Sequence, residues 1–149
     1  MPRFTIESTI AAPVEVCFDL SRSIDLHLES MITSGEKAVD GVTSGLIKAG
    51  ETVSWEARHF GILWRMTSEI VAFDPPHRFV DQMVRGPFAR FRHEHRFTAA
   101  AGGTTVMTDV VDFAMRLGPI ANVPAGAYLR RLMRLRNEAI RAKAEGAAQ

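Results

Sequence analysis

The residues best suited to chemistry lie in one segment, Arg90–Phe97, which reads Arg-Phe-Arg-His-Glu-His-Arg-Phe. If this segment is a strand, successive side chains point to opposite faces of the sheet. One face then carries aromatic rings and imidazoles, from Phe91, His93, His95 and Phe97. The other face carries charged groups that we expect to meet water, from Arg90, Arg92, Glu94 and Arg96. Rings mixed with imidazoles indicate a small-molecule pocket, which is apolar but needs a few polar groups.

Three roles are open to His93 and His95, which lie two residues apart and so share a face. Metal ligation with Asp109 or His59 is one, but the spacing of structural zinc sites and the His-Glu-x-x-His motif are both missing, so we predict no metal. General acid–base catalysis is another, because imidazole titrates near neutrality; the candidate catalytic residues are His93, His95 and Asp109. The role we favour is hydrogen bonding that tunes the polarity of the pocket.

Two carboxylates are placed to enter the same pocket. Asp81 shares a strand face with Phe79 and Met83, and Asp109 shares one with Met107. Burial would raise the pKa of both carboxyl groups unless a histidine or an arginine pairs with them. An inward Asp–His pair suits acid–base work, whereas a structural ion pair is the simpler interpretation. The opposite face of the last strand, which carries Thr104, Val106, Thr108 and Val110, is almost as apolar. The sequence therefore leaves open which face of this strand points into the cavity.

Large apolar side chains on the same strand faces and on the final helix complete the expected binding site. Methionine suits it because its flexible side chain adapts to irregular shapes. Phe88 follows the turn Gly86-Pro87 and is expected at the mouth of the cavity. The predicted ligand-binding residues are Trp55, His59, Trp64, Met66, Phe79, Asp81, Met83, Phe88, Phe91, His93, His95, Met107, Asp109, Leu129 and Met133.

To bring these residues together, the chain needs a series of strands joined by short turns, with helices before and after the series. Alternating polarity predicts strands over Arg3–Ile10, Thr52–His59, Leu63–Phe73, Arg78–Val84, Arg90–Phe97 and Thr104–Phe113. Pro13, at a first helical position, and the serines 21 and 23 predict two short helices, over Val14–Leu20 and on to about Ser30. An irregular strand and a glycine-rich turn are expected over residues 31–50, and a glycine hairpin at 102–103.

A period of 3.6 predicts one amphipathic helix from about residue 122 to 144. Its inward stripe holds Leu129, Leu132, Met133, Arg136 and Ile140. Basic side chains surround the stripe, at Arg130, Arg131, Arg134, Arg141 and Lys143. We therefore expect an α+β domain spanning 1–149, in which a curved antiparallel sheet of six to seven strands wraps around this helix and leaves a cavity between them.

Composition narrows the functional classes. The 149 residues suit one domain, and the formal net charge of +1 gives no reason to expect nucleic-acid binding. Cys17 is the single cysteine, so no intramolecular disulfide forms, and we expect it to be inert packing. No signal peptide and no membrane span is expected, so a cytoplasmic location is the prediction. We expect no cofactor, and the apolar Ile120, Val123 and Tyr128 suit either a homodimer contact or a lid.

The chain resembles the START-like superfamily, also called SRPBCC, and within it a small stand-alone bacterial subgroup labelled polyketide cyclase/dehydrase-like. The resemblance covers nearly the whole chain and implies the helix-grip fold. It implies no single activity, because the superfamily includes lipid carriers, hormone receptors, cyclases and co-chaperone domains. The motifs that carry it are Ser8–Phe18, Gly45–Ile47, Gly50–Ala57, Pro75–Asp81, Gly86–Phe88, His93–Phe97, Gly102–Thr104 and Asp109–Phe113.

Three functions follow as hypotheses. The first is binding of a small hydrophobic or amphipathic molecule, such as a lipid, isoprenoid, quinone or aromatic polyketide, between the sheet and the final helix. The second is a cyclase or dehydratase that uses the pocket histidines and aspartates to move protons. The third is a protein-interaction module that docks through the basic residues Arg130, Arg131 and Arg134.

Overall fold

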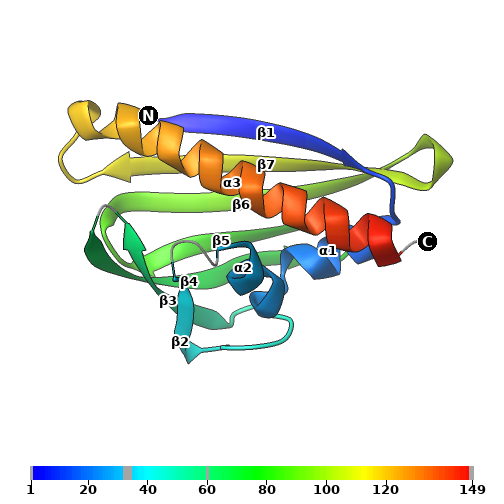
Figure 1. Cartoon of the computed structure of the whole chain (residues 1–149), viewed down its shortest axis with the longest axis horizontal. Coiled ribbons are helices and arrows are strands. Elements are labelled where there is room, and N and C mark those ends of the chain that lie inside the picture. The colour runs from blue at the N-terminus through cyan, green and yellow to red at the C-terminus, as the bar shows by residue number, and fades with distance from the viewer. Residues whose placement is uncertain (1, 32–34, 60, 148–149) are drawn as a thin grey trace.

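A seven-stranded antiparallel sheet forms the body of the protein in a computed structural model, which describes residues 2–31, 35–59 and 61–147. The strands are β1 (Arg3–Ile10), β2 (Lys37–Gly41), β3 (Thr52–His59), β4 (Ile62–Asp74), β5 (Arg78–Arg85), β6 (Phe88–Ala100) and β7 (Thr104–Met115). They lie in the order β1-β7-β6-β5-β4-β3-β2, so the first strand pairs with the last (Figure 1). From β2 to β7 the strands lie side by side in chain order, whereas α1 and α2 connect β1 at one edge of the sheet to β2 at the other.

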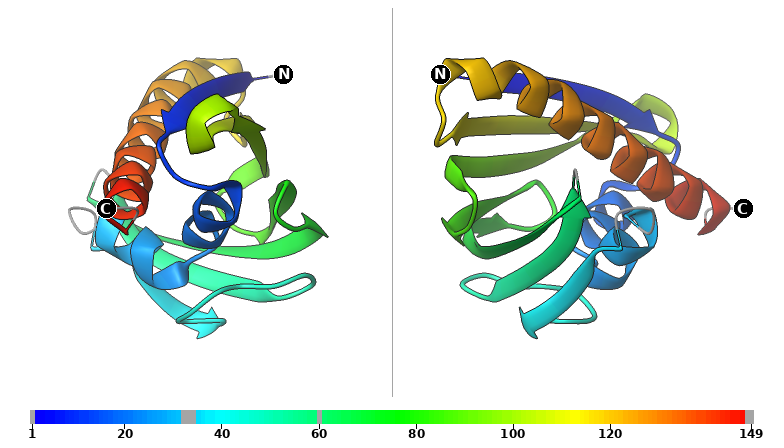
Figure 2. Two further views of the ribbon diagram at one scale, coloured as in Figure 1. Left: turned by 90° about the vertical axis from the view of Figure 1, so that its right-hand side faces the viewer. Right: turned by 60° about the vertical axis from the view of Figure 1, so that its left-hand side comes forward.

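Three helices cover one face of this sheet (Figure 1). The short helices are α1 (Val14–Ser21) and α2 (Ile24–Ser30), and the long one is α3 (Pro119–Ala147). The sheet curves beneath α3, which crosses it from the β1–β7 side toward α1 (Figure 2). This is the predicted helix-grip architecture, and the expected fold class is confirmed. Within the described ranges, no helix pairs a membrane-spanning length with the necessary apolar character.

Helix α3 meets the rest of the protein at two places. Near its start, a side chain at Gly126 would lie 3.2 Å from the Phe113 ring, so glycine permits the close approach to β7. Near its end, Ile140 and Ala144 are buried in the cluster that contains Phe18 of α1. The helix is therefore held at both ends, by a close approach at Gly126 and by the buried side chains of Ile140 and Ala144.

Three expectations about the elements need correction. Helix α3 begins at Pro119, three residues before the expected start, because a first-turn proline loses no helical hydrogen bond. Pro13 is instead the N-cap of α1, one residue before the helix. Strand β6 begins at Phe88, two residues before the expected start at Arg90 and directly after the bend at Gly86 and Pro87. Of the expected irregular segment 31–50, residues 32–34 lie outside the described residues, and Lys37–Gly41 forms the edge strand β2.

The outer face of β6 is also less open to water than expected. Glu94 is only 6% exposed, because Arg78 and Arg96 both bind its carboxylate. Burial raises the pKa of the Glu94 carboxyl, but these two arginines outweigh it and bring the pKa to about 2. Arg90 pairs with Asp112 at 2.5 Å on the same face. The charged side of the histidine strand is therefore a row of ion pairs.

Truncating Ile140 tests the docking of α3. We expect Ile140→Ala to lower the free energy of unfolding by about 2–5 kcal/mol, because the residue is 1% exposed and its loss leaves a cavity. The matched control is Leu135→Ala on the same helix, where the side chain is 39% exposed and the cost is about 0.5 kcal/mol or less. Urea denaturation measures both. Equal losses would contradict this packing of the helix.

Candidate functional site

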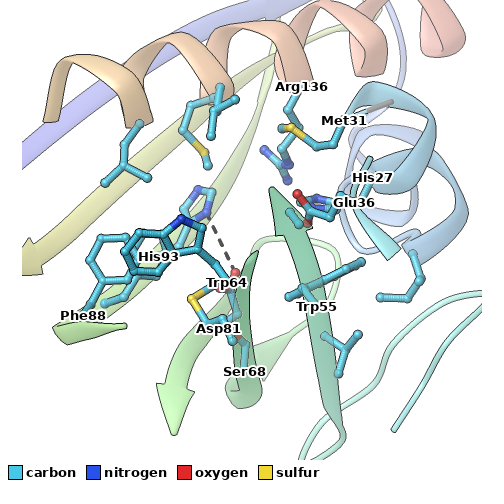
Figure 3. A pocket seen from close by; sticks show the side chains of 18 of the residues that line it. His27, Met31, Glu36, Trp55, Trp64, Ser68, Asp81, Phe88, His93 and Arg136 are labelled. Carbon is cyan, nitrogen blue, oxygen red and sulfur yellow. Dashed lines mark hydrogen bonds and ion pairs between the residues drawn. The ribbon is translucent and has the colours of Figure 1, made fainter. Parts of the chain in front are cut away.

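A cavity of about 230 Å³ lies between the curved sheet and the helices α2 and α3 (Figure 3). Its volume is slightly below the range of about 300–1,000 Å³ common for small-molecule sites, and it suits a ligand of one or two rings. Strands β3 to β6 form the sheet side of the wall, and the helices and loops supply the rest. Twelve of the fifteen residues predicted to bind a ligand line it: Trp55, His59, Trp64, Met66, Phe79, Asp81, Phe88, Phe91, His93, His95, Leu129 and Met133.

The other three predicted residues do not line the cavity. Met107 points inward, as expected, but α1 covers that part of β7, and the Ser21 hydroxyl contacts its sulfur at 3.4 Å. Met83 is half-buried and packs against a core cluster under the first half of α3, which contains Phe4, Phe91, Val111, Phe113, Leu129 and Met133. Asp109 is fully buried behind His93 rather than at the cavity wall. The structure thus directs Met107 and Asp109 inward, on the strand whose direction the sequence left open, but other side chains separate them from the cavity.

Arg136 and Asp109 form a buried ion pair between α3 and β7, with 3.3 Å between Nη1 and Oδ1. The two residues are 4% and 0% exposed. Asp109 also accepts hydrogen bonds from His93 Nε2 at 2.8 Å and from Asn137 Nδ2 at 2.8 Å. Burial raises the pKa of the Asp109 carboxyl, but the His93 hydrogen bond and the Arg136 charge outweigh it and leave the pKa well below its usual range. Asp109 is therefore a buried anion, already saturated with donors.

His95 links this ion pair to the cavity. Arg136 donates from Nη2 to His95 Nδ1 at 3.1 Å, so Nδ1 must be unprotonated. The remaining proton lies on Nε2, which donates to Asp81 Oδ2 at 2.6 Å. Burial, and then the neighbouring His93 and Arg136, lower the pKa of His95 to about 3. His95 is thus a neutral imidazole whose tautomer is fixed by a buried arginine.

Asp81 is the carboxylate that faces the cavity, with 22% of its side chain exposed. Burial raises its pKa, but the hydrogen bond that His95 donates, with the Arg136 charge behind it, outweighs this and leaves the pKa below its ordinary value. His93 Nδ1 lies 3.9 Å from Asp81 Oδ2, and Figure 3 shows the two side chains facing each other. An ionised acceptor and an imidazole nitrogen therefore lie together at the cavity wall.

The donor set does not fit a metal ion. Among the described residues, one group of three has suitable ligand atoms within reach of one another, namely Asp81, His93 and His95. Ligation by His95 Nε2 would require its proton to move to Nδ1, where Arg136 already donates. Two ligands would remain, fewer than the three protein ligands of a catalytic zinc site. Of the other residues considered for a metal site, Asp109 is saturated and His59 contacts Tyr128 at 2.5 Å.

Several cavity residues were missed by the sequence analysis. His27 Nε2 lies 2.6 Å from Glu36 Oε1, and its ring lies over Trp55 at 4.3 Å between centroids. Tyr128 connects α3 to the end of β3 through His59. Arg136 did give a signal, because it is the one charged residue on the inward stripe of α3. His27 and Glu36 lie on a short helix and an irregular segment, whose docking no local pattern specifies.

Ser68 is a further missed residue, on the inward face of β4. Its hydroxyl is the one buried side-chain polar atom among the described residues that has no hydrogen-bond partner. The residue is 3% exposed and lines the cavity.

The surfaces considered for a protein partner lie elsewhere. Arg130, Arg131 and Arg134 are exposed on α3, and the Arg130 guanidinium lies 5.2 Å from the centroid of the Phe4 ring. Ile120 and Val123 are 91% and 78% exposed at the start of the helix. The interaction module and the homodimer both stay predictions.

The pKa of His95 predicts how stability responds to acid. An unfolded histidine titrates near 6.5, so between about pH 6.5 and pH 3 the unfolded chain binds a proton here that the folded chain does not. Stability should therefore fall as the pH falls, by up to about 1.4 kcal/mol per pH unit from this residue. The depressed pKa of Asp109 acts in the same direction, but its contribution is lost only below about pH 4.

The matching experiment is urea denaturation of His95→Gln between about pH 7 and pH 5. Glutamine can donate to Asp81 and accept from Arg136, so we expect the fold to persist with a shallower pH dependence than the wild type. His77→Gln, in the exposed turn after β4, controls for loss of an imidazole in general. Identical slopes in His95→Gln and the wild type would show that His95 ionises alike in the folded and unfolded chains.

Comparison with solved structures supports the fold. The aromatase/cyclase Zhui from a Streptomyces species matches with a TM-score of 0.77 and 14% identity, covering 99% of this chain and 96% of that one. A START superfamily protein from Mycobacterium smegmatis matches with a TM-score of 0.72 and 12% identity, covering 97% and 98%. A Thermus thermophilus protein gives 0.73 and 17%, covering 99% and 100%. At these identities the likeness establishes the fold alone.

Sequence comparison identifies the family. No curated protein shows significant similarity to this chain. The family model described as polyketide cyclase / dehydrase and lipid transport matches residues 1–145. This agrees with the expected START-like resemblance and with a fold suited to hydrophobic ligands or to cyclase chemistry. The chain therefore belongs to the polyketide cyclase/dehydrase and lipid transport family.

Proposed function

We propose that the protein binds a small amphipathic molecule in the cavity between the sheet and α3. The observation that carries the proposal is the distribution of polarity in the wall. Aromatic and aliphatic side chains make up most of it, including Trp55, Trp64, Phe88 and Phe91. The polar groups lie in a few places, of which Asp81 is the one carboxylate backed by a buried network. Such a site orients a ligand by its polar end and holds it by its apolar part.

Burial of apolar surface would supply most of the affinity. A ligand of two rings that buries about 150–250 Å² gains roughly 4–6 kcal/mol at about 25 cal/mol per Å². The family description includes lipid transport, and the Streptomyces protein of similar fold is named an aromatase/cyclase. Both names support an apolar or aromatic ligand. The contact between His59 and Tyr128 joins β3 to α3 and would help to hold the ligand in place.

A cyclase or dehydratase is the second candidate, and one specific observation favours it. Asp81 and His93 Nδ1 both face the cavity, and each is supported from behind, by His95 and Asp109 respectively. Ring closure and loss of water both require a proton to be removed and one to be supplied. Asp81 can accept the proton, and His93 Nδ1, which carries none while Nε2 donates to Asp109, can take that proton over from Asp81 and return it to the bound molecule. Asp109, buried and saturated, would position His93 without touching the substrate.

Blocking the cavity tests ligand binding. We expect Leu132→Trp to abolish copurification of a bound molecule, because Leu132 lines the cavity and indole would fill part of its volume. Leu135→Trp is the matched control, since it places the same side chain on the exposed side of α3. Native mass spectrometry of freshly purified protein measures the adduct. An adduct that survives in Leu132→Trp, or no adduct and no binding of apolar probes by the wild type, would contradict the proposal.

Changing Asp81 separates a binder from an enzyme. If the cavity catalyses dehydration, Asp81→Asn should hold a molecule that is heavier by one water than the one extracted from the wild type. If it catalyses ring closure, the two extracted molecules should be isomers with different spectra. A binder should yield the same molecule from both proteins, in a smaller amount from the variant. Extraction followed by mass and absorbance spectra decides among these outcomes.

A further inference from the structure

The Ser68 hydroxyl is the feature that the rest of the structure does not explain. Other buried or half-buried hydroxyls of the sheet have partners: Ser54 Oγ lies 2.7 Å from Thr67 Oγ1, and Thr105 donates to the Ala12 carbonyl at 2.8 Å. Ser68 has none, although it is 3% exposed. A buried polar atom without a partner is costly, so such atoms point to a group that binds there.

A second unused acceptor lies beside it. Asp81 Oδ2 accepts from His95, whereas Oδ1 accepts no hydrogen bond recorded within the described residues. In the register of β4 and β5, Ile70 lies opposite Asp81, so Ser68 is the diagonal neighbour of Asp81 on the same inward face. Figure 3 shows both side chains on the same part of the cavity wall. The two oxygens can therefore contact one polar group of a bound molecule.

Among the described residues that line the cavity, both arginines are already paired, so neither guanidinium is left for an anionic ligand. The Arg22 guanidinium pairs with Asp19 at 2.9 Å and also donates to the Ile47 carbonyl. The Arg136 guanidinium is shared among Asp109, His95, Asn137 and the Ser21 carbonyl. Glu36 adds a second carboxylate to the wall, beside His27. A carboxylate or phosphate placed at Asp81 would therefore meet a like charge with no unpaired arginine beside it.

We infer that the ligand carries a hydrogen-bond-donating polar end, a hydroxyl or an amine, which Asp81 Oδ1 and Ser68 Oγ bind together. This deepens the proposed function and rests on it. A phenol or alcohol donates a hydrogen bond to the ionised carboxylate and accepts a hydrogen bond from the serine hydroxyl, so it satisfies both protein groups at once. An amine donates to both oxygens, and the aromatic wall also favours its charge. Molecules whose polar end is an anion, such as fatty acids, should bind more weakly than such donors.

Matched naphthalene probes test this inference, because they differ only in the polar end. The probes are 2-naphthol, 2-methoxynaphthalene, which has no donor, 2-naphthoate, which is an anion, and 2-(aminomethyl)naphthalene, which is a cationic donor. Isothermal titration or probe fluorescence gives each Kd. We expect at least one of the two donors, 2-naphthol or the amine, to bind about tenfold more tightly than 2-methoxynaphthalene. We expect 2-naphthoate to bind more weakly than either donor. The ratio between the hydroxyl and the amine shows which donor the site prefers.

The variant that isolates the interaction is Ser68→Ala. It removes a hydroxyl without a partner, so we expect no loss of stability, together with a threefold to tenfold smaller preference for the donor probe. Ser21→Ala is the matched control: that hydroxyl also lines the cavity but already donates to the Cys17 carbonyl at 2.8 Å, so the preference should not change. Asp81→Asn should reduce the preference further and improve binding of 2-naphthoate.

The outcomes separate this inference from the function on which it rests. Equal binding of 2-naphthol, the amine and 2-methoxynaphthalene, all blocked by Leu132→Trp, would overturn the inference and leave the binding cavity intact. Tightest binding of 2-naphthoate, or a donor preference that Ser68→Ala does not change, would also overturn it. If the wild type binds none of the four probes, the inference and the proposed function fail together.

Discussion

The ion pair between Asp109 and Arg136 is the contact on which the rest of the site depends. It joins β7 to α3 in the interior, so it helps to determine where the helix crosses the sheet. A pair of apolar residues of similar size could stabilise such a crossing equally well, so stability alone does not account for it. The same guanidinium fixes the tautomer of His95, and His95 in turn donates to Asp81. One buried cation therefore controls the state of a carboxylate at the cavity wall.

The cavity follows from how α3 is docked. Gly126 allows the helix to approach Phe113 closely, and Ile140 and Ala144 bury it against α1. Between these contacts the sheet curves away, and rings from the strands cover only part of the space. An apolar wall on its own would hold a ligand without orienting it. The network behind Asp81 supplies direction, at the cost of keeping several polar groups out of water.

The sequence predicted the features that depend on local periodicity. Alternation assigned His93, His95 and Asp81 to inward faces, and the inward stripe of α3 included Arg136. It could not predict which part of an inward face remains open. Met107 is covered by α1 and Asp109 by His93, and both outcomes depend on contacts between segments far apart in the chain. Ser68 gave no signal, because an inward serine becomes unusual only when its neighbours are known to leave it without a partner.

Membership of the family leaves binding and catalysis both open, because the same fold serves both. In the binding mode that we propose, the distinction would depend on the proton that the ligand brings to Asp81. His95 stays neutral and holds Asp81 in its ionised form, so Asp81 can accept a hydrogen bond or a proton but has none to give. An alcohol would keep its proton and simply be bound. A more acidic donor, such as an enol or a phenol activated by a carbonyl group, could transfer its proton to the carboxylate, and His93 Nδ1 lies close enough to take part in its return. With such a ligand, the acidity of the bound group, rather than the fold, would decide whether the cavity carries a molecule or changes it.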